Sequence, residues 1–181
     1  MTKDGRGRPS FVVYADVMIR RILPVTFWAV LSLACRAAPP LANTLESPEA
    51  LGRALLDAVA QRDRSRLDAL ALSEREFRDH VWPDLPAARP ERNLPFSYVW
   101  GDLHQKSQIS LSKALEQHGG KRYTLHRVRF RGQTQYAHYV VHGEATFDVV
   151  DPAMAARALR VCGSFIQKDG GWKVFSYVVD D

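Results

Sequence analysis

Three histidines in the C-terminal half of the chain could act as general bases or as zinc ligands, two roles that imidazole often fills. If residues 132–134 form a hairpin loop, His126 faces Val140 across the hairpin. His138 and His142 then flank it on the same sheet face, at diagonal distances of ~7–8 Å that would let flexible rings converge. A register slip of one residue would separate them, and the alternative is that each ring makes its own hydrogen bonds. No independent ligand motif accompanies them, so we predict no metal and no other cofactor and treat the three histidines as pocket-lining candidates.

Tyr136 falls on the same predicted sheet face as these histidines, together with Val128 and Phe130. An apolar face of an antiparallel sheet is normally covered by other elements. We therefore expect Tyr136 to line the space between the sheet and the element that covers it.

A second set of candidates lies in residues 100–108, where a helix expected to pack on a sheet carries small and polar residues. Ser107 interrupts the apolar stripe and could form the floor of a cavity, Trp100 could form its aromatic wall, and Asp102 could serve as a general base. The alternative is that Ser107 allows close packing and that Asp102 pairs with Lys106 one turn later. Spacing alone does not separate these interpretations.

Motifs of established catalytic classes are missing from the sequence. It has no Gly-x-Ser-x-Gly elbow for a serine nucleophile and no glycine-rich phosphate loop ahead of a helix. Cys162 lies in an apolar strand pattern, which is typical of a core thiol. No residue is therefore predicted to be catalytic from a motif.

The composition limits the class of partner. The chain has 181 residues, of which 46% are hydrophobic and 25% charged, values typical of one folded domain. Its net charge is +5, but six of the 25 basic residues and only two of the 20 acidic ones precede residue 43. The remaining 19 basic and 18 acidic residues nearly cancel, so the folded part lacks the positive excess that nucleic-acid binding requires.

The N-terminal region has the form of a signal peptide. Two arginines follow Met18, and an apolar stretch over residues 22–34 leads into small residues and prolines. At ~1.5 Å per residue this stretch spans about 20 Å, less than the ~30 Å of a membrane core. We predict a mis-assigned start or polar extension over 1–17, a signal peptide and processing region over 18–42, and a single domain over 47–181. The protein is expected to be exported, either to the periplasm or to a membrane-anchored position in the cell envelope.

Cys35 is the candidate for lipidation. It follows the small residue Ala34, as in a bacterial lipobox, although Ser32 stands where a branched aliphatic residue is usual. The alternative is ordinary cleavage after Ala37, which leaves a soluble protein. A lipid on Cys35 or an uncleaved leader would be the only attachment to a membrane.

The elements that must position these residues fall into a helical half and a strand half. Ser47, Asp63 and Ser73 are capping residues that predict the starts of three helices, and Gly119 ends a fourth. The predicted helices cover residues 48–62, 64–72, 74–82 and 97–118. From residue 121 the apolar period changes to two, which predicts strands. The predicted strands cover residues 122–131, 135–150, 158–167 and 172–179. The expected fold class is α+β, with the helices packed on one curved, four-stranded antiparallel sheet.

The final hairpin reads FIQKDGGWKV over residues 165–174. In element order and in this aspartate-glycine-tryptophan ending, residues 47–179 resemble the cone-shaped superfamily of ketosteroid isomerase, polyketide cyclases and nuclear transport factor. The resemblance implies a curved sheet wrapped around a long helix, a pocket between them and often a dimer. The chain is also similar to exported bacterial proteins that share this order of elements. No site motif of the enzymes matches a position here, so no catalytic residue is carried over.

Two functions are consistent with these observations. The first is a non-catalytic exported domain that binds a small apolar molecule or an envelope protein in the pocket between helix and sheet, with a homodimer left open. The alternative is a small pocket enzyme of isomerase, cyclase or hydrolase type that uses Asp102 or a histidine as general base.

Overall fold

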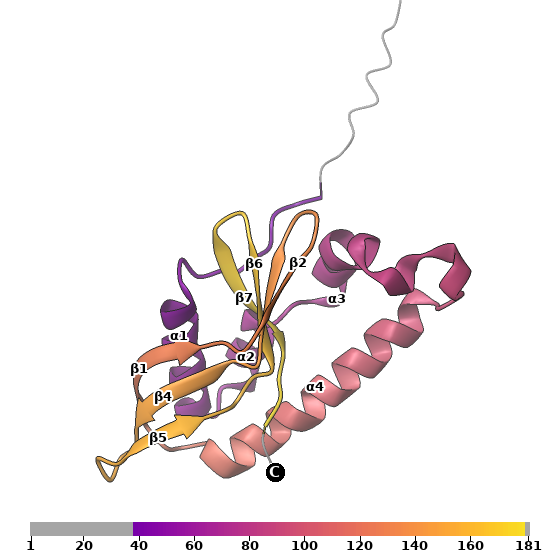
Figure 1. Cartoon of the computed structure of the whole chain (residues 1–181). Coiled ribbons are helices and arrows are strands. Elements are labelled where there is room, and N and C mark those ends of the chain that lie inside the picture. The colour runs from indigo at the N-terminus through magenta and orange to yellow at the C-terminus, as the bar shows by residue number, and fades with distance from the viewer. Residues whose placement is uncertain (1–37, 180–181) are drawn as a thin grey trace, which may run out of the picture. The chain divides into compact units, whose positions relative to one another are not determined.

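The computed structural model describes residues 38–179, which form an α+β fold in which the helices precede the strands (Figure 1). This confirms the predicted fold class. The predicted leader and Cys35 lie outside the described residues. None of the helices within residues 38–179 is both long and apolar enough to cross a membrane.

The first two helices begin at the predicted caps. Helix α1 (Pro48–Gln61) starts after Ser47, whose Oγ accepts a hydrogen bond from the Ala50 amide at 3.0 Å. Helix α2 (Arg64–Leu70) starts after Asp63, which accepts one from the Arg66 amide at 2.9 Å. The buried face of α1 contributes Leu51, Leu55 and Val59 to the main core. That face packs on strands of both sheets, so α1 is the helix around which the fold is built.

The third predicted helix consists of two pieces. Helix α3 (Glu74–Glu76) begins with a capping box between Ser73 and Glu76, and it continues as a π-helical turn, η1 (Phe77–Val81). Phe77 and Val81 are buried. Three short 3₁₀ helices then carry the proline-rich segment: η2 (Trp82–Asp84), η3 (Pro86–Ala88) and η4 (Pro90–Arg92). Helix α4 (Phe96–His118) follows them.

The strands form two antiparallel sheets, so the prediction of a single four-stranded sheet was imprecise. The three-stranded sheet has the order β1 (Thr124–Arg129), β4 (Thr146–Val150), β5 (Ala156–Leu159). The four-stranded sheet has the order β2 (Gln133–Gln135), β3 (Val140–Gly143), β6 (Ser164–Lys168), β7 (Gly171–Ser176). The predicted tight hairpin joins β6 to β7 through Asp169 and Gly170, both with positive φ, as a primed two-residue turn requires.

The predicted register of the first hairpin is wrong. Strand β1 pairs with β4, not with the strand that follows it, and β2 pairs with β3 so that Gln135 lies opposite Val140. The reason is that the expected long strand over 135–150 breaks twice. The Tyr136 amide donates to the Tyr139 carbonyl in a tight turn, and Glu144 takes a φ of 47°. The two halves of that stretch therefore join different sheets.

Two hydrophobic clusters make up the interior. The larger one joins α1 to Phe147, Phe165 and the rest of the inner strand faces. Gly52 allows this contact, because a Cβ there would lie 2.8 Å from Leu125 Cδ2. The smaller cluster surrounds Phe77, Val81, Tyr139 and Ile166, and half-buried aromatic rings from the proline-rich segment, α4 and β7 close it. The candidate site borders this second cluster.

Candidate functional site

A cavity of about 670 Å³ lies between α2, α4 and β7, and we call it the α4 groove. Helix α4 begins beside the proline-rich segment, and its later turns contact α1 and β7 (Figure 1). The groove is lined by Arg64, Asp68, Ala71, Leu72, Ser73, Glu74, Trp100, Leu103, His104, Ser107, Gln108 and Phe175.

One wall of the groove is apolar and is built on the second core cluster. The Trp100 ring packs against Phe77 with centroids 5.2 Å apart, and Leu103 and Phe175 pack against the same cluster. His104 stacks on Trp100 at 5.2 Å, with 24° between the rings. Because Phe77 is buried and supports Trp100 from behind, this wall is held in place before any ligand arrives.

The other wall is polar and is organised by the side-chain amide of Gln108. Its Nε2 donates to Asp68 Oδ1 at 2.9 Å, and its Oε1 accepts from Arg64 Nη2. Arg64 Nη1 also donates to Ser112 Oγ at 3.1 Å. Among residues 38–179, neither Arg64 nor Asp68 forms an ion pair. The groove therefore holds one cation and one anion whose partners are neutral.

Of the residues predicted from helix 97–118, Trp100 and Ser107 come together in the α4 groove. Ser107 Oγ also accepts a hydrogen bond from the Tyr177 amide at 2.9 Å, so it both lines the cavity and ties α4 to the chain after β7. Asp102 does not line the groove. It is exposed and accepts from Lys106 Nζ at 2.8 Å, as the alternative interpretation predicts.

The three histidines do not share a site, because the register that would align them is not formed. His126 is exposed at the irregularity of β1, where the pairing shifts between its two neighbours. His138 is exposed in the turn between β2 and β3. His142 packs its ring on Trp172 at 4.6 Å and donates from Nε2 to Gln167 Oε1 at 3.1 Å. No group of His, Cys, Asp and Glu that could hold a metal is found among the described residues.

Tyr136 is half-buried in the second core cluster and lies outside the α4 groove. Its ring stacks on that of Tyr139 with centroids 4.6 Å apart. Tyr139 in turn donates from its hydroxyl to the Val81 carbonyl at 3.3 Å. Tyr136 is therefore partly covered, but its ring packs on Tyr139 and does not line the α4 groove.

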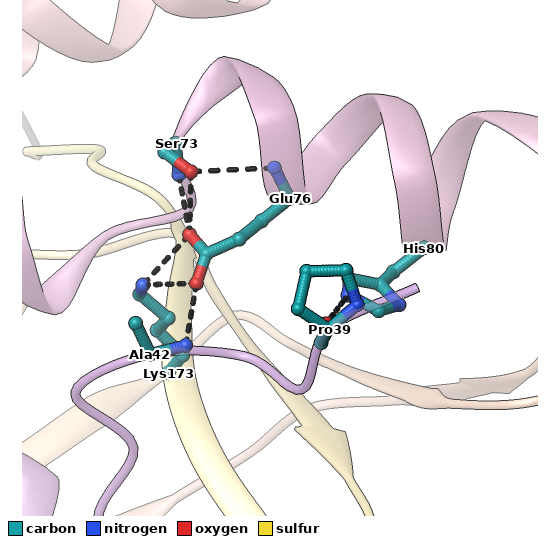
Figure 2. Close-up of polar contacts among 6 residues, drawn as sticks. All are labelled: Pro39, Ala42, Ser73, Glu76, His80 and Lys173. Atoms are coloured by element: carbon teal, nitrogen blue, oxygen red, sulfur yellow. Dashed lines mark hydrogen bonds and ion pairs between the residues drawn. The ribbon is translucent and has the colours of Figure 1, made fainter. Parts of the chain in front are cut away.

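A second, smaller cavity of about 350 Å³ also borders the segment that joins α2 to α3. It shares Asp68, Ala71 and Ser73 with the α4 groove. Figure 2 shows the polar cluster at its base, in which Lys173 Nζ lies 2.7 Å from each carboxylate oxygen of Glu76. Both residues are buried, with 2% of Lys173 and 8% of Glu76 exposed.

Backbone and hydroxyl groups complete the hydrogen bonding of Glu76. The Ser73 amide, the Ser73 hydroxyl and the Ala42 amide each donate to it at 2.8 Å. Burial raises the pKa of Glu76, but the hydrogen bonds from Lys173, Ser73 and Ala42 outweigh it and hold the pKa below its usual value. Because both carboxylate oxygens already accept hydrogen bonds from the protein, we assign this pair a structural role and not that of a general acid or base.

Residues 39–45 cross this smaller cavity, and we call them the N-terminal strap. His80 Nε2 donates to the Pro39 carbonyl at 2.7 Å, and Ala42 donates to Glu76 as above (Figure 2). Leu45 exchanges two backbone hydrogen bonds with Trp172, at 3.0 and 2.8 Å. The sequence predicts a processing region up to residue 42 and gives no sign of these contacts.

The polar wall of the α4 groove was missed as well, because its residues stand on two helices and carry no local motif. Arg64 and Asp68 are ordinary exposed residues of a short helix, and Gln108 lies 40 residues beyond Asp68. Comparison of the chain with protein-family models, curated proteins and solved structures found no match. The chemistry of the α4 groove is therefore argued from its own geometry.

Proposed function

We propose that this protein is an exported, non-catalytic domain that binds a small amphipathic molecule in the α4 groove. The observation that carries the proposal is the groove itself, in which apolar and polar side chains line one cavity of about 670 Å³. Small-molecule sites commonly measure roughly 300–1,000 Å³ and combine apolar walls with a few polar groups that fix orientation.

The two walls make different contributions to binding. Apolar surface on Trp100, Leu103 and Phe175 supplies favourable free energy when a ligand displaces water from it. The hydrogen-bonding groups of Arg64 and Asp68 penalise any ligand that covers them without replacing their contacts with water. Such a site selects a molecule with one apolar end and one polar end.

The arrangement supports binding more than catalysis. Asp102, the predicted general base, lies on the solvent side of α4. His104 is the titratable ring in the groove. It stacks on Trp100, and no acidic residue among residues 38–179 forms a hydrogen bond with it. A general base normally needs a partner that orients it.

The sequence of the leader supports the place of action that we propose, which is the periplasm or a membrane surface reached through a lipid anchor at Cys35. The order of helices and strands, with a pocket between a helix and a sheet, supports the resemblance to the cone-shaped superfamily. We retain that relationship as part of the proposal. An envelope protein as partner, and a homodimer, remain alternatives for the same fold.

The test uses the fluorescent amphiphile 8-anilinonaphthalene-1-sulfonate and the full-length protein. We expect one saturable site, and we expect Gln108→Trp to weaken binding by at least about tenfold because the new ring fills the groove. Gln105→Trp is the matched control, because Gln105 is exposed on α4 outside the groove. Gln105→Trp should keep the wild-type melting temperature, and circular dichroism should show that Gln108→Trp stays folded although it loses the hydrogen bonds to Arg64 and Asp68. Equal binding by wild type and Gln108→Trp would overturn the proposal.

A further inference from the structure

On the basis of the proposed function, we infer that the α4 groove takes a free α-amino acid with a large apolar side chain. Its carboxylate would pair with Arg64, its ammonium group with Asp68, and its side chain with the wall at Trp100. The inference rests on the charges of the polar wall, on the way Gln108 contacts them and on the apolar wall that lines the same cavity.

Arg64 is a cation with unused hydrogen-bonding capacity. A guanidinium group carries five N–H donors in a plane, and here the acceptors are the Gln108 amide oxygen and the Ser112 hydroxyl. Both acceptors are neutral. A carboxylate that entered the groove would add charge-assisted hydrogen bonds in the paired geometry that guanidinium favours.

Asp68 is an anion in the complementary position. Its side chain accepts one hydrogen bond, at Oδ1 from Gln108 Nε2, and within the described chain it contacts no cationic group. It lines the groove one helical turn after Arg64, and the two side chains do not pair with each other. An ammonium group could therefore reach Asp68 without breaking an existing ion pair.

The amide of Gln108 shows the polarity that a ligand must have at this wall. Its oxygen, an acceptor, faces Arg64, and its nitrogen, a donor, faces Asp68. A free α-amino acid presents the same pattern with full charges, because its carboxylate accepts and its ammonium group donates from the same carbon. A simple anion or a simple cation would satisfy one of the two residues and leave the other unpaired.

The remaining charged lining residue does not alter this balance. Glu74 accepts from Arg78 Nη2 at 2.6 Å and is paired before a ligand arrives. The charges open to a ligand are therefore one positive and one negative. The apolar wall formed by Trp100, Leu103 and Phe175 lines the same cavity, so an amino acid with an aromatic or long aliphatic side chain would place each part on a matching surface.

The test is calorimetric titration of the full-length protein with L-phenylalanine and two analogues that each lack one charge. 3-Phenylpropionate lacks the ammonium group and 2-phenylethylamine lacks the carboxylate. We expect L-phenylalanine to bind at least about tenfold more tightly than either, which corresponds to about 1.4 kcal/mol. L-Leucine and L-tryptophan are titrated in parallel, so that the size of one side chain does not decide the result.

Charge-neutral variants identify the partners. Arg64→Gln should remove the preference for L-phenylalanine over 2-phenylethylamine, and Asp68→Asn should remove its preference over 3-phenylpropionate. The matched controls are Arg66→Gln and Asp57→Asn, exposed residues outside the groove that should leave every preference intact.

The outcomes separate this inference from the proposed function. If 8-anilinonaphthalene-1-sulfonate binds and Gln108→Trp blocks it, but none of the three amino acids binds, the amino-acid inference is wrong and the binding function stands. Equal affinity for L-phenylalanine and 3-phenylpropionate would also overturn it, in favour of an anion site. If neither the fluorescent amphiphile nor any amino acid binds, both proposals fail.

Discussion

Lys173 and Glu76 are 97 residues apart in the chain, yet the Lys173 ammonium nitrogen lies 2.7 Å from both oxygens of the Glu76 carboxylate. The pair joins β7 to α3, and the Ala42 amide adds the N-terminal strap to the same carboxylate. Three segments that are distant in sequence therefore depend on one buried charge pair. The first three predictions follow from this arrangement.

Removing one member of the pair should be strongly destabilising. In Lys173→Met the Glu76 carboxylate stays buried without its cation, and such losses typically cost about 3–5 kcal/mol. Urea denaturation measures the change in the free energy of unfolding. The control is Lys106→Met, which breaks the exposed pair with Asp102 and should leave the unfolding midpoint unchanged. A midpoint in Lys173→Met equal to that of the wild type would show that the pair does not hold these segments together.

The stability contributed by Glu76 should depend on pH in a defined direction. Its folded pKa is lower than the usual 4.5, so its carboxylate stabilises the protein above that pH, and the contribution is lost as the pH falls through the folded pKa. The difference in unfolding free energy between wild type and Glu76→Gln should therefore shrink from about pH 7 to about pH 3. The pKa of Asp148, lowered to about 2 by hydrogen bonds from Arg129 and Arg127, affects both proteins equally and cancels. A difference that grows on acidification would contradict the assignment.

The strap can be tested by removing a single donor. Ala42→Pro abolishes the amide that donates to Glu76 Oε1 and should cost about 1.5 kcal/mol, the low end for hydrogen bonds to charged groups. Ala42→Gly keeps the amide and serves as the control. Limited proteolysis of the folded protein should cut residues 39–45 faster in the proline variant. Equal cutting rates in the two variants would mean that this hydrogen bond does not hold the strap in place.

Two helical glycines should respond to alanine in opposite directions. At Gly52 the added methyl group meets Leu125 Cδ2 at 2.8 Å and Val128 Cγ2 at 3.0 Å, so overpacking should cost about 1–3 kcal/mol. At Gly101 nothing lies within 4 Å, so alanine should stabilise α4 by up to about 1 kcal/mol. Thermal unfolding of both variants checks the contrast. A stabilised Gly52→Ala protein would show that α1 does not lie as close to β1 as described.

The helices were predictable because their signals are local. Ser47, Asp63 and the Ser73–Glu76 box lie within three residues of the groups they cap, so the sequence contains the whole interaction. The strands beyond residue 132 were harder. Their pairing depends on where the backbone turns back. Tyr136 is not a residue type that is typical of a break, and Gly143, beside Glu144, indicates a bend in a strand but not a change of sheet.

The residues of the candidate site also differ in whether their signals are local in the sequence. Trp100 and Ser107 could be predicted as lining residues, because polar residues that interrupt the apolar face of a helix can be recognised within that one segment of sequence. Arg64, Asp68 and Gln108 become one polar wall only after α2 and α4 pack together. Glu76 stands three residues after Ser73, at the spacing of a capping box, but its charged partner Lys173 lies in a distant strand between Trp172 and Val174, which are apolar and buried.

The two outer strands of the four-stranded sheet also differ in how they are protected from other chains. Strand β2 is three residues long, polar and exposed, and such a short edge provides few backbone groups for pairing with a strand of another molecule. Strand β7 is longer and more apolar, and it is shielded by Leu45 bonded to Trp172 and by the Leu72 amide bonded to the Val174 carbonyl. Loss of the strap would expose part of that edge on an otherwise folded molecule. Because an exposed strand edge can pair with another chain, we expect removal of the strap to promote aggregation at high protein concentration.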